Sequence, residues 1–312
     1  MTQVLAIGTF NDTEAAALTE AFGCRVLAEV DGLGGLDQAV RDAVTAVAFK
    51  GHQGFGAAEM AQLPGLKLLA NYGVGYDSID VAAASAQGIT VTNTPDVLND
   101  DVADLAIALW LMQGREMQQA ADWVRSGNWA GEGAFGLSRK LSGSKVGVVG
   151  LGRIGREIAE RLAAFKCEVH YHSRSQKQTP GWAYHADPVA LASAVDFLFI
   201  ALVGGPETEG YVSKEVISAL GPRGVIVNIS RGSTVDETAM LDALEAGELA
   251  GAALDVFVNE PQIDPRFLAL PNVVIQPHQG SATHDTRAAM ARLQRDNIAA
   301  HLAGAALLTP VN

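Results

Sequence analysis

The chain has 312 residues, of which 48% are hydrophobic and 18% are charged. At about 150 residues per domain this length predicts two domains, and the apolar fraction excludes an intrinsically disordered protein. The formal net charge of −13 argues against sequence-independent binding of nucleic acid, which needs a basic face. No apolar stretch approaches the ~18 residues of a membrane span, and no basic segment marks a secretory signal at the N-terminus, so we expect a cytoplasmic protein that binds no membrane.

Short β-branched runs alternate with alanine-rich amphipathic stretches in the first third of the chain. Runs of strand length cover 4–7, 45–49, 67–70 and 89–92. This alternation is typical of a parallel sheet covered by helices. A longer helix should then begin near residues 99–101, any of which could cap it, and continue to about Arg125. Its length marks the start of a second domain.

A second alternating series follows the glycine-rich loop at 127–136. Its predicted strands cover 145–149, 168–171, 196–201, 224–229, 250–254 and 273–275. Six strands suffice for a complete dinucleotide-binding sheet. A last helix over about 283–303 follows the sixth strand, so we expect it to return to the first domain. The sequence therefore predicts an α/β protein with two doubly wound parallel-sheet domains, in which 99–283, a Rossmann domain, is inserted between 1–98 and 284–312.

The strongest local motif lies between a predicted strand and a predicted helix. It reads Gly150-Leu151-Gly152-Arg153-Ile154-Gly155. Glycines at these positions allow a tight turn, close approach of the backbone to a pyrophosphate and close packing of helix on strand. The motif predicts that this domain binds a dinucleotide at the N-terminus of the helix.

The end of the next predicted strand lacks the acidic residue typical of NAD binders. That residue stands about 20 residues after the motif and hydrogen-bonds the ribose 2′-hydroxyl. Here the segment reads His172-Ser173-Arg174, which we expect beside the adenosine ribose. A hydroxyl and a guanidinium bind a 2′-phosphate, which favours NADP over NAD. The alternative is that Arg174 and Lys177 only solvate the tip of a loop.

Three polar residues follow the last predicted strands. Arg231, Glu260 and His278 each stand after a strand end, where open α/β sheets bind ligands. Taken singly, each is more often a surface ion-pair partner, a loop carboxylate or a structural histidine. Together, beside a dinucleotide, they would supply a carboxylate anchor and a general acid tuned by a carboxylate. The two cysteines have no neighbours at metal-ligand spacing, so we expect neither a metal nor a disulfide framework.

Ordered motifs along essentially the whole chain resemble those of the D-2-hydroxyacid dehydrogenase family, most closely its glyoxylate/hydroxypyruvate reductase members. The matching stretches are NYGVGYD at 71–77 with ID at 79–80, NTP at 93–95, GLGRIG at 150–155, PET at 206–208, NISRG at 228–232 with VDE at 235–237, LDVF at 254–257 with EP at 260–261, and PH at 277–278 with GS at 280–281. The resemblance implies an NAD(P)H-dependent reduction of short 2-oxoacids such as glyoxylate and hydroxypyruvate. Ser173 and Arg174 match its NADP-using branch.

The resemblance also implies roles for individual residues. His278 becomes the acid/base, Glu260 its partner and Arg231 the anchor of the substrate carboxylate, which the amides of Val74 and Gly75 also bind. Further contacts to the cofactor are implied for Pro206, Thr208, Ser230, Asp255 (to the nicotinamide carboxamide) and Gly280. The domain made of both chain ends becomes the substrate-binding domain, and the segment 99–136 matches the arm through which the family forms homodimers.

Some questions stay open at this level. A nucleotide-sensing regulator on the same scaffold could keep all these residues, although the acidic charge argues against it. A formate dehydrogenase would carry Gln in place of Glu260. Lys50 could attract an oxoacid, but a solvated loop lysine is the favoured interpretation. Gln279 and the glycine-rich stretch at 131–136 leave the choice of oxoacid open.

Overall fold

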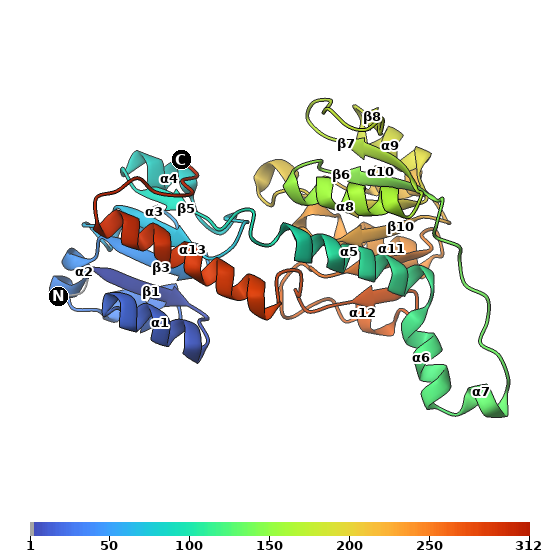
Figure 1. Cartoon of the computed structure of the whole chain (residues 1–312), viewed down its shortest axis with the longest axis horizontal. Coiled ribbons are helices and arrows are strands. Elements are labelled where there is room, and N and C mark those ends of the chain that lie inside the picture. Colours follow the sequence, from blue (N-terminus) through green and yellow to red (C-terminus); the bar gives the residue numbers. More distant parts are fainter. Residues whose placement is uncertain (1–2) are drawn as a thin grey trace. The chain divides into compact units, whose positions relative to one another are not determined.

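The computed structural model describes residues 3–312, which form two compact units (Figure 1). Unit 1 comprises the described residues up to Val97 together with Thr283–Asn312, and unit 2 comprises Leu98–Ala282. Each unit contains one sheet whose strands all pair in parallel. The predicted α/β class with two parallel sheets is therefore confirmed. Over residues 3–312, none of the helices combines the length and the apolar character that crossing a bilayer requires.

Unit 1 has a sheet in the order β2-β1-β3-β4-β5. Its strands are β1 (Val4–Gly8), β2 (Arg25–Leu27), β3 (Ala46–Lys50), β4 (Leu68–Asn71) and β5 (Thr90–Thr92), and its helices are α1 (Asp12–Phe22), η1 (Val30–Gly35), α2 (Gln38–Ala43), α3 (Ala57–Ala61), α4 (Val81–Ala86) and α13 (His284–Leu302). The four predicted strands are present. The edge strand β2 escaped prediction because its three residues are largely exposed and form no apolar run.

The last helix, α13, packs against β3 and β4 of unit 1. Gln294 on this helix is almost fully buried, and its Nε2 donates to the carbonyl oxygens of Phe49 at 3.0 Å and Ala70 at 2.8 Å. One side chain thus satisfies acceptors on two neighbouring strands, which fixes the helix across the sheet.

Unit 2 has a sheet in the order β12-β11-β10-β9-β6-β7-β8. Its strands are β6 (Lys145–Val149), β7 (Glu168–His172), β8 (Ala183–His185), β9 (Phe197–Ile200), β10 (Val225–Asn228), β11 (Gly251–Leu254) and β12 (Val273–Ile275). The first six in chain order follow the doubly wound dinucleotide-binding topology, whose order reverses between β6 and β9. The six predicted strands are present, and a seventh, β8, was missed because it is short and only partly buried.

Helices cover this sheet, and one of them is apolar almost all round. They are α5 (Asn99–Gly114), α6 (Met117–Arg125), α7 (Asn128–Gly131), α8 (Arg153–Ala164), α9 (Pro188–Ala194), η2 (Pro206–Thr208), α10 (Lys214–Leu220), η3 (Gly232–Thr234), α11 (Glu237–Glu245) and α12 (Arg266–Ala269). Helix α5 packs against α8 and the sheet. Its Trp110 is fully buried and meets Phe165, Phe197 and Phe199 edge to face, a favoured aromatic arrangement.

The single helix expected from about 99 to 125 is wrong in two respects. The chain breaks it at Glu116, whose backbone is left-handed with φ of 48°, so that α5 and α6 are separate helices. No side chain caps α5; Leu98 occupies the N-cap, and Asp100 and Asp101 lie in the first turn, where the helix dipole favours acidic groups. Beyond the break, α6 and α7 extend away from the sheet of unit 2 (Figure 1).

Candidate active site

The glycine-rich loop has the strand–turn–helix context that its motif requires. Gly150 leaves β6 with a φ of +96°, and a Cβ there would lie 2.5 Å from the carbonyl oxygen of Ala201. A Cβ on Gly155 would lie 1.9 Å from the carbonyl oxygen of Gly150, so the first turn of α8 packs directly on the loop. At Gly152, by contrast, no atom lies within 4 Å of the Cβ position. The backbone is therefore open at the one position where a diphosphate has to approach it.

The residues at and after the end of β7 differ in exposure. Ser173 is half-buried and its hydroxyl donates to the carbonyl oxygen of Ser175 at 2.7 Å, while Arg174 is exposed. His172 is buried, and its ring bonds to the carbonyl oxygen of His185 and to the hydroxyl of Tyr211. Both ring nitrogens of His172 are therefore engaged inside the protein, so this side chain has a structural role at the end of β7.

The loops after β9 and β10 hold other predicted cofactor contacts. Pro206 and Thr208 form η2, where the Thr208 hydroxyl donates to the carbonyl oxygen of Val203 at 2.6 Å. Ser230 is buried and donates to Oδ1 of Asn228 at 2.9 Å. These hydroxyls thus stabilise the loops in which they lie.

Asp255, which follows β11, holds the segment that contains His278. Its side chain is 1% exposed, and its two oxygens accept from the backbone N–H of Gln279 at 2.6 Å and of Gly280 at 2.8 Å. Its carbonyl oxygen accepts from the backbone N–H of His278 at 2.9 Å. Burial raises the pKa of Asp255, although the two amides and the nearby imidazole of His278 oppose the rise.

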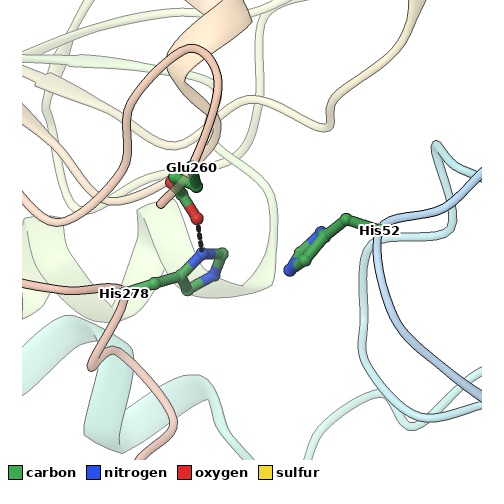
Figure 2. A group of neighbouring side chains, drawn as sticks. All are labelled: His52, Glu260 and His278. Carbon is green, nitrogen blue, oxygen red and sulfur yellow. Dashed lines mark hydrogen bonds and ion pairs between the residues drawn. The ribbon is translucent and has the colours of Figure 1, made fainter. Parts of the chain in front are cut away.

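His278 and Glu260 form the central pair of unit 2 (Figure 2). Nδ1 of His278 lies 2.7 Å from Oε2 of Glu260, whose other oxygen accepts from the backbone N–H of Phe257 at 2.8 Å. Because a carboxylate only accepts, Nδ1 carries the proton and Nε2 is the nitrogen that can serve a substrate. His278 also has a φ of +54°, a strained conformation for this residue type that is typical of functional sites.

The pair borders a hollow in unit 2 with a volume of about 230 Å³. The residues that line it, besides the pair itself, are mostly apolar: Phe257, Pro261, Ile263, Ile275, Gln276 and Pro277. The side chains of His278 and Glu260 remain 32% and 23% exposed. A histidine hydrogen-bonded to a carboxylate in apolar but accessible surroundings can exchange a proton with a ligand.

Arg231 lies on the loop after β10, next to the loop that contains Glu260. Its Nη1 donates to the carbonyl oxygen of Ser230 at 2.7 Å. A Cβ on the following Gly232 would lie 2.0 Å from the carbonyl carbon of Phe257, so the two loops are in backbone contact. The structure thus joins Glu260 to His278 and brings the loop of Arg231 against that of Glu260.

In unit 1, two asparagines fix the loop that contains Val74 and Gly75. Asn71 donates to the carbonyl oxygens of Gly73 at 3.2 Å and Gly75 at 2.8 Å, and Asn93 donates to that of Val74 at 3.0 Å. In a planar trans peptide the C=O and the next N–H point in opposite directions. The amides of Val74 and Gly75 therefore point away from the asparagines. Figure 2 also labels His52, an exposed residue of the same unit that follows β3.

Lys50 is not the solvated loop lysine that the sequence favoured. Its Nζ lies 2.5 Å from Oε2 of Glu14 and 4.5 Å from the ring centroid of Tyr72, and its side chain is 17% exposed. Burial opposes ionisation of Glu14. The hydrogen bonds from Lys50 and from the backbone N–H of Asn11 nevertheless lower the pKa of Glu14. Burial also raises the pKa of Tyr72 to about 12. Lys50 is thus a structural cation beside the loop that starts at Asn71.

Sequence reasoning gave no role to Glu237, which supports the loop of Glu260. Its Oε2 accepts from the backbone N–H of Val258 at 2.9 Å. Burial raises the pKa of Glu237, and the carboxylates of Asp264 and Glu260 add to the rise. The V-D-E triplet at 235–237 was a visible signal, but nothing local indicates that its Glu reaches a loop 21 residues away.

Comparison with known proteins shows which family the chain resembles. A family model described as D-isomer specific 2-hydroxyacid dehydrogenase, NAD binding domain, matches residues 107–280, which is more than half of the chain. Hydroxyphenylpyruvate reductase of Plectranthus scutellarioides is 45% identical over 270 residues, which cover 86% of this chain and 86% of that protein. Glyoxylate/hydroxypyruvate reductase A HPR2 of Arabidopsis thaliana is 45% identical over 271 residues, covering 87% and 86%.

Among solved structures, a close match is the NADPH-dependent glyoxylate/hydroxypyruvate reductase of Sinorhizobium meliloti in complex with NADP and malonate. The TM-score is 0.93 and the identity 44%, with 99% of this chain and 96% of that chain covered. The similarity thus extends over both units of the chain.

The Glu14–Lys50 pair gives a pH-dependent contribution to stability. Because the folded-state pKa of Glu14 is lowered, this contribution is fully present above its ordinary value of 4.5 and disappears as the pH falls through the lowered value. Glu14→Gln should reduce the free energy of unfolding by about 1.5–3 kcal/mol at pH 7. Urea unfolding should show that the difference from wild type shrinks below pH 4.5.

The exposed pair Asp122–Arg125 provides the control. Asp122→Asn should change the free energy of unfolding by less than about 1 kcal/mol. An equal loss in both variants, or a Glu14→Gln difference that does not change with pH, would contradict the stabilising role of the Glu14–Lys50 pair.

Proposed function

Because this chain belongs to the D-isomer specific 2-hydroxyacid dehydrogenase family, we propose that it reduces short 2-oxoacids, glyoxylate and hydroxypyruvate among them, to 2-hydroxyacids. The observation that carries the proposal is the His278–Glu260 pair. The two residues follow the carboxyl ends of β12 and β11, and the glycine-rich loop follows the carboxyl end of β6 in the same sheet. The names of the relatives from Arabidopsis and Sinorhizobium support the choice of substrate. Unit 2 acts as the dinucleotide-binding domain and unit 1 as the substrate-binding domain.

His278 is the general acid of the proposed reaction. When bound, a reduced nicotinamide would supply the hydride that the carbonyl carbon of the oxoacid accepts. Nε2 of protonated His278 hydrogen-bonds the carbonyl oxygen and gives it a proton, while Glu260 holds the ring through Nδ1 and stabilises its positive charge. Proton delivery and charge stabilisation thus use opposite nitrogens of one ring.

Three groups bind the substrate carboxylate in this proposal. The guanidinium of Arg231 forms a bidentate pair with it. The amides of Val74 and Gly75 donate to it, which the outward direction of their N–H groups supports. An oxoacid held at its carboxylate presents its carbonyl to His278 in one orientation.

The cofactor is NADP in preference to NAD. The open backbone at Gly152 fits a diphosphate, and Ser173 and Arg174 provide a hydroxyl and an exposed cation for a 2′-phosphate. The Sinorhizobium reductase is NADPH-dependent and its structure is a complex with NADP, which supports this choice. The proposed cofactor contacts are Gly150, Gly152, Arg153, Ile154, Gly155, Ser173, Arg174, Pro206, Thr208, Ser230, Asp255 and Gly280.

The segment after α5 supports a homodimer. Met117, Val124 and Trp129 are all more than half exposed on α6 and α7. Trp110, which precedes them on α5, is instead fully buried in unit 2 and contributes nothing to this surface. Exposed apolar side chains on a projecting arm favour burial against a second copy of the chain. Two free thiols, Cys24 and Cys167, agree with a cytoplasmic location.

Removal of His278 tests whether the protein is an enzyme or a nucleotide-sensing regulator. Wild type should turn over glyoxylate or hydroxypyruvate with NADPH, and His278→Ala should lower kcat by about 10²- to 10⁴-fold. The rate of reduction should fall at high pH, where His278 loses its proton. In Glu260→Gln this fall should occur at a lower pH than in wild type, because the carboxylate that stabilises the protonated ring is gone. His284→Ala, an exposed histidine at the start of α13, should leave kcat unchanged. A wild type that binds NADPH without turnover of any 2-oxoacid would favour the regulator.

The cofactor choice is tested by exchanging the charge beside the ribose. Wild type should have a higher kcat/KM for NADPH than for NADH. Ser173→Asp combined with Arg174→Ala should reverse the order, since hydrogen bonds to charged groups contribute ~1.5–3 kcal/mol, or roughly 10- to 150-fold. Equal use of both cofactors by wild type, or an unchanged preference in the double variant, would refute the assignment.

The dimer is tested by placing charge on the arm. Val124→Asp with Trp129→Asp should give a monomer in light scattering at concentrations where wild type is dimeric, because a buried unpaired carboxylate opposes association. Leu268→Asp, at an exposed leucine of α12, should leave the dimer intact. A wild-type protein that is monomeric and fully active would rule the dimer out.

A further inference from the structure

The proposed 2′-phosphate contacts lie on a loop that neither His278 nor Glu260 supports, so other residues must hold it. Ser173 and Arg174 begin the connection from β7 to β8, and Arg174 is exposed. An exposed arginine discriminates between cofactors only if its backbone is held in place, since ordering a flexible loop on binding costs free energy. The residue directly before them, His172, is the last of β7 and is buried.

The ring of His172 joins three separate segments. Nδ1 lies 2.9 Å from the carbonyl oxygen of His185 in β8, and Nε2 lies 2.6 Å from the hydroxyl of Tyr211. A carbonyl only accepts, so Nδ1 carries the proton. The tyrosine hydroxyl therefore donates to Nε2. The ring centroids of His172 and Tyr211 are 5.7 Å apart and the ring planes are tilted by 31°.

Tyr211 is itself firmly placed. The residues on both sides of it bond to the loop after β10: the N–H of Gly210 donates to the carbonyl oxygen of Ser233 at 2.8 Å, and that of Val212 to the carbonyl oxygen of Thr234 at 2.9 Å. This loop also contains Arg231. The hydroxyl of Tyr211 thus connects the end of β7 to the segment after η2. That segment is in turn hydrogen-bonded to the loop that contains Arg231, the proposed carboxylate anchor.

A second tyrosine restrains the same loop from the other side. The hydroxyl of Tyr184 in β8 donates to the carbonyl oxygen of Ser173 at 3.3 Å, and the Ser173 hydroxyl donates to the carbonyl oxygen of Ser175. The backbone that precedes Arg174 is therefore held at His172 and at Ser173, while the guanidinium stays exposed to a ligand.

We propose that Tyr211 is a positioning residue for cofactor selection: through His172 its hydroxyl holds the end of β7 in the conformation from which Ser173 and Arg174 reach a 2′-phosphate. The proposal rests on the proposed use of NADP. Tyr211 lies 37 positions after Arg174 in the sequence. Loss of its hydroxyl should weaken the binding of NADPH but not that of NADH, which has no 2′-phosphate.

The test is Tyr211→Phe in the full-length protein, which removes the hydroxyl and keeps the ring. Loss of the net contribution of one hydrogen bond corresponds to a change of about 2- to 12-fold. Titration with NADPH and with NADH should show that the ratio of the two dissociation constants falls by that factor, chiefly through weaker binding of NADPH. Circular dichroism and thermal unfolding verify that the variant is folded.

Two further variants separate positioning from general damage. In the Arg174→Ala background, Tyr211→Phe should change the ratio little, because the group that it positions is gone. Tyr72→Phe is the matched control: it removes another bonded hydroxyl, which donates to the carbonyl oxygen of Arg287 at 3.0 Å in unit 1, and should leave the ratio unchanged.

The outcomes are distinct. A wild type that binds NADPH and NADH equally would overturn the NADP preference itself. A wild type that prefers NADPH, with a Tyr211→Phe variant that keeps the same preference or loses affinity for both cofactors equally, would overturn the role of Tyr211 alone. An equal effect of Tyr211→Phe with and without Arg174 would also overturn it.

Discussion

The hydrogen bond between Nδ1 of His278 and Oε2 of Glu260 depends on several features of unit 2. It joins loops from β11 and β12, so it requires two neighbouring parallel strands that end side by side. The backbone of His278 is left-handed, and a strained residue persists only where its surroundings hold it. Asp255 does so through the amides of His278, Gln279 and Gly280.

One buried and one partly buried carboxylate serve as backbone supports in this region. Asp255 and Glu237 both have a raised pKa because burial disfavours their charged forms, yet each accepts hydrogen bonds from main-chain amides of a functional loop. Such bonds to a charged acceptor are stronger than neutral ones, which offsets part of the desolvation cost. The two loops are thereby ordered before any ligand binds, and preorganisation of this kind favours both affinity and catalysis.

Local sequence patterns predicted the helices and strands that are apolar and regular. They failed to predict side-chain contacts between residues that lie far apart in the sequence. The bounds of β6 and β12 were predicted to the residue, since each is a short β-branched run beside glycine or proline signals. Strands β2 and β8 escaped because exposed edge strands have no apolar run. The glycine-rich loop was recognisable because its glycines are needed locally. The partners of Lys50 and His172 were not, because Glu14 and Tyr211 lie 36 and 39 residues away, and sequence spacing contains no information on such contacts.

The place of α13 has a consequence for the order in which the chain acquires structure during synthesis. Residues 98–282 form unit 2 without a contribution from outside that range, whereas unit 1 needs residues 283–312. Until Gln294 has emerged from the ribosome, the carbonyl oxygens of Phe49 and Ala70 lack the donor that they have in the finished protein. The part translated first is therefore completed last, and one apolar face of the nascent first sheet, which α1 shares with α13, is only partly covered while the inserted unit is made.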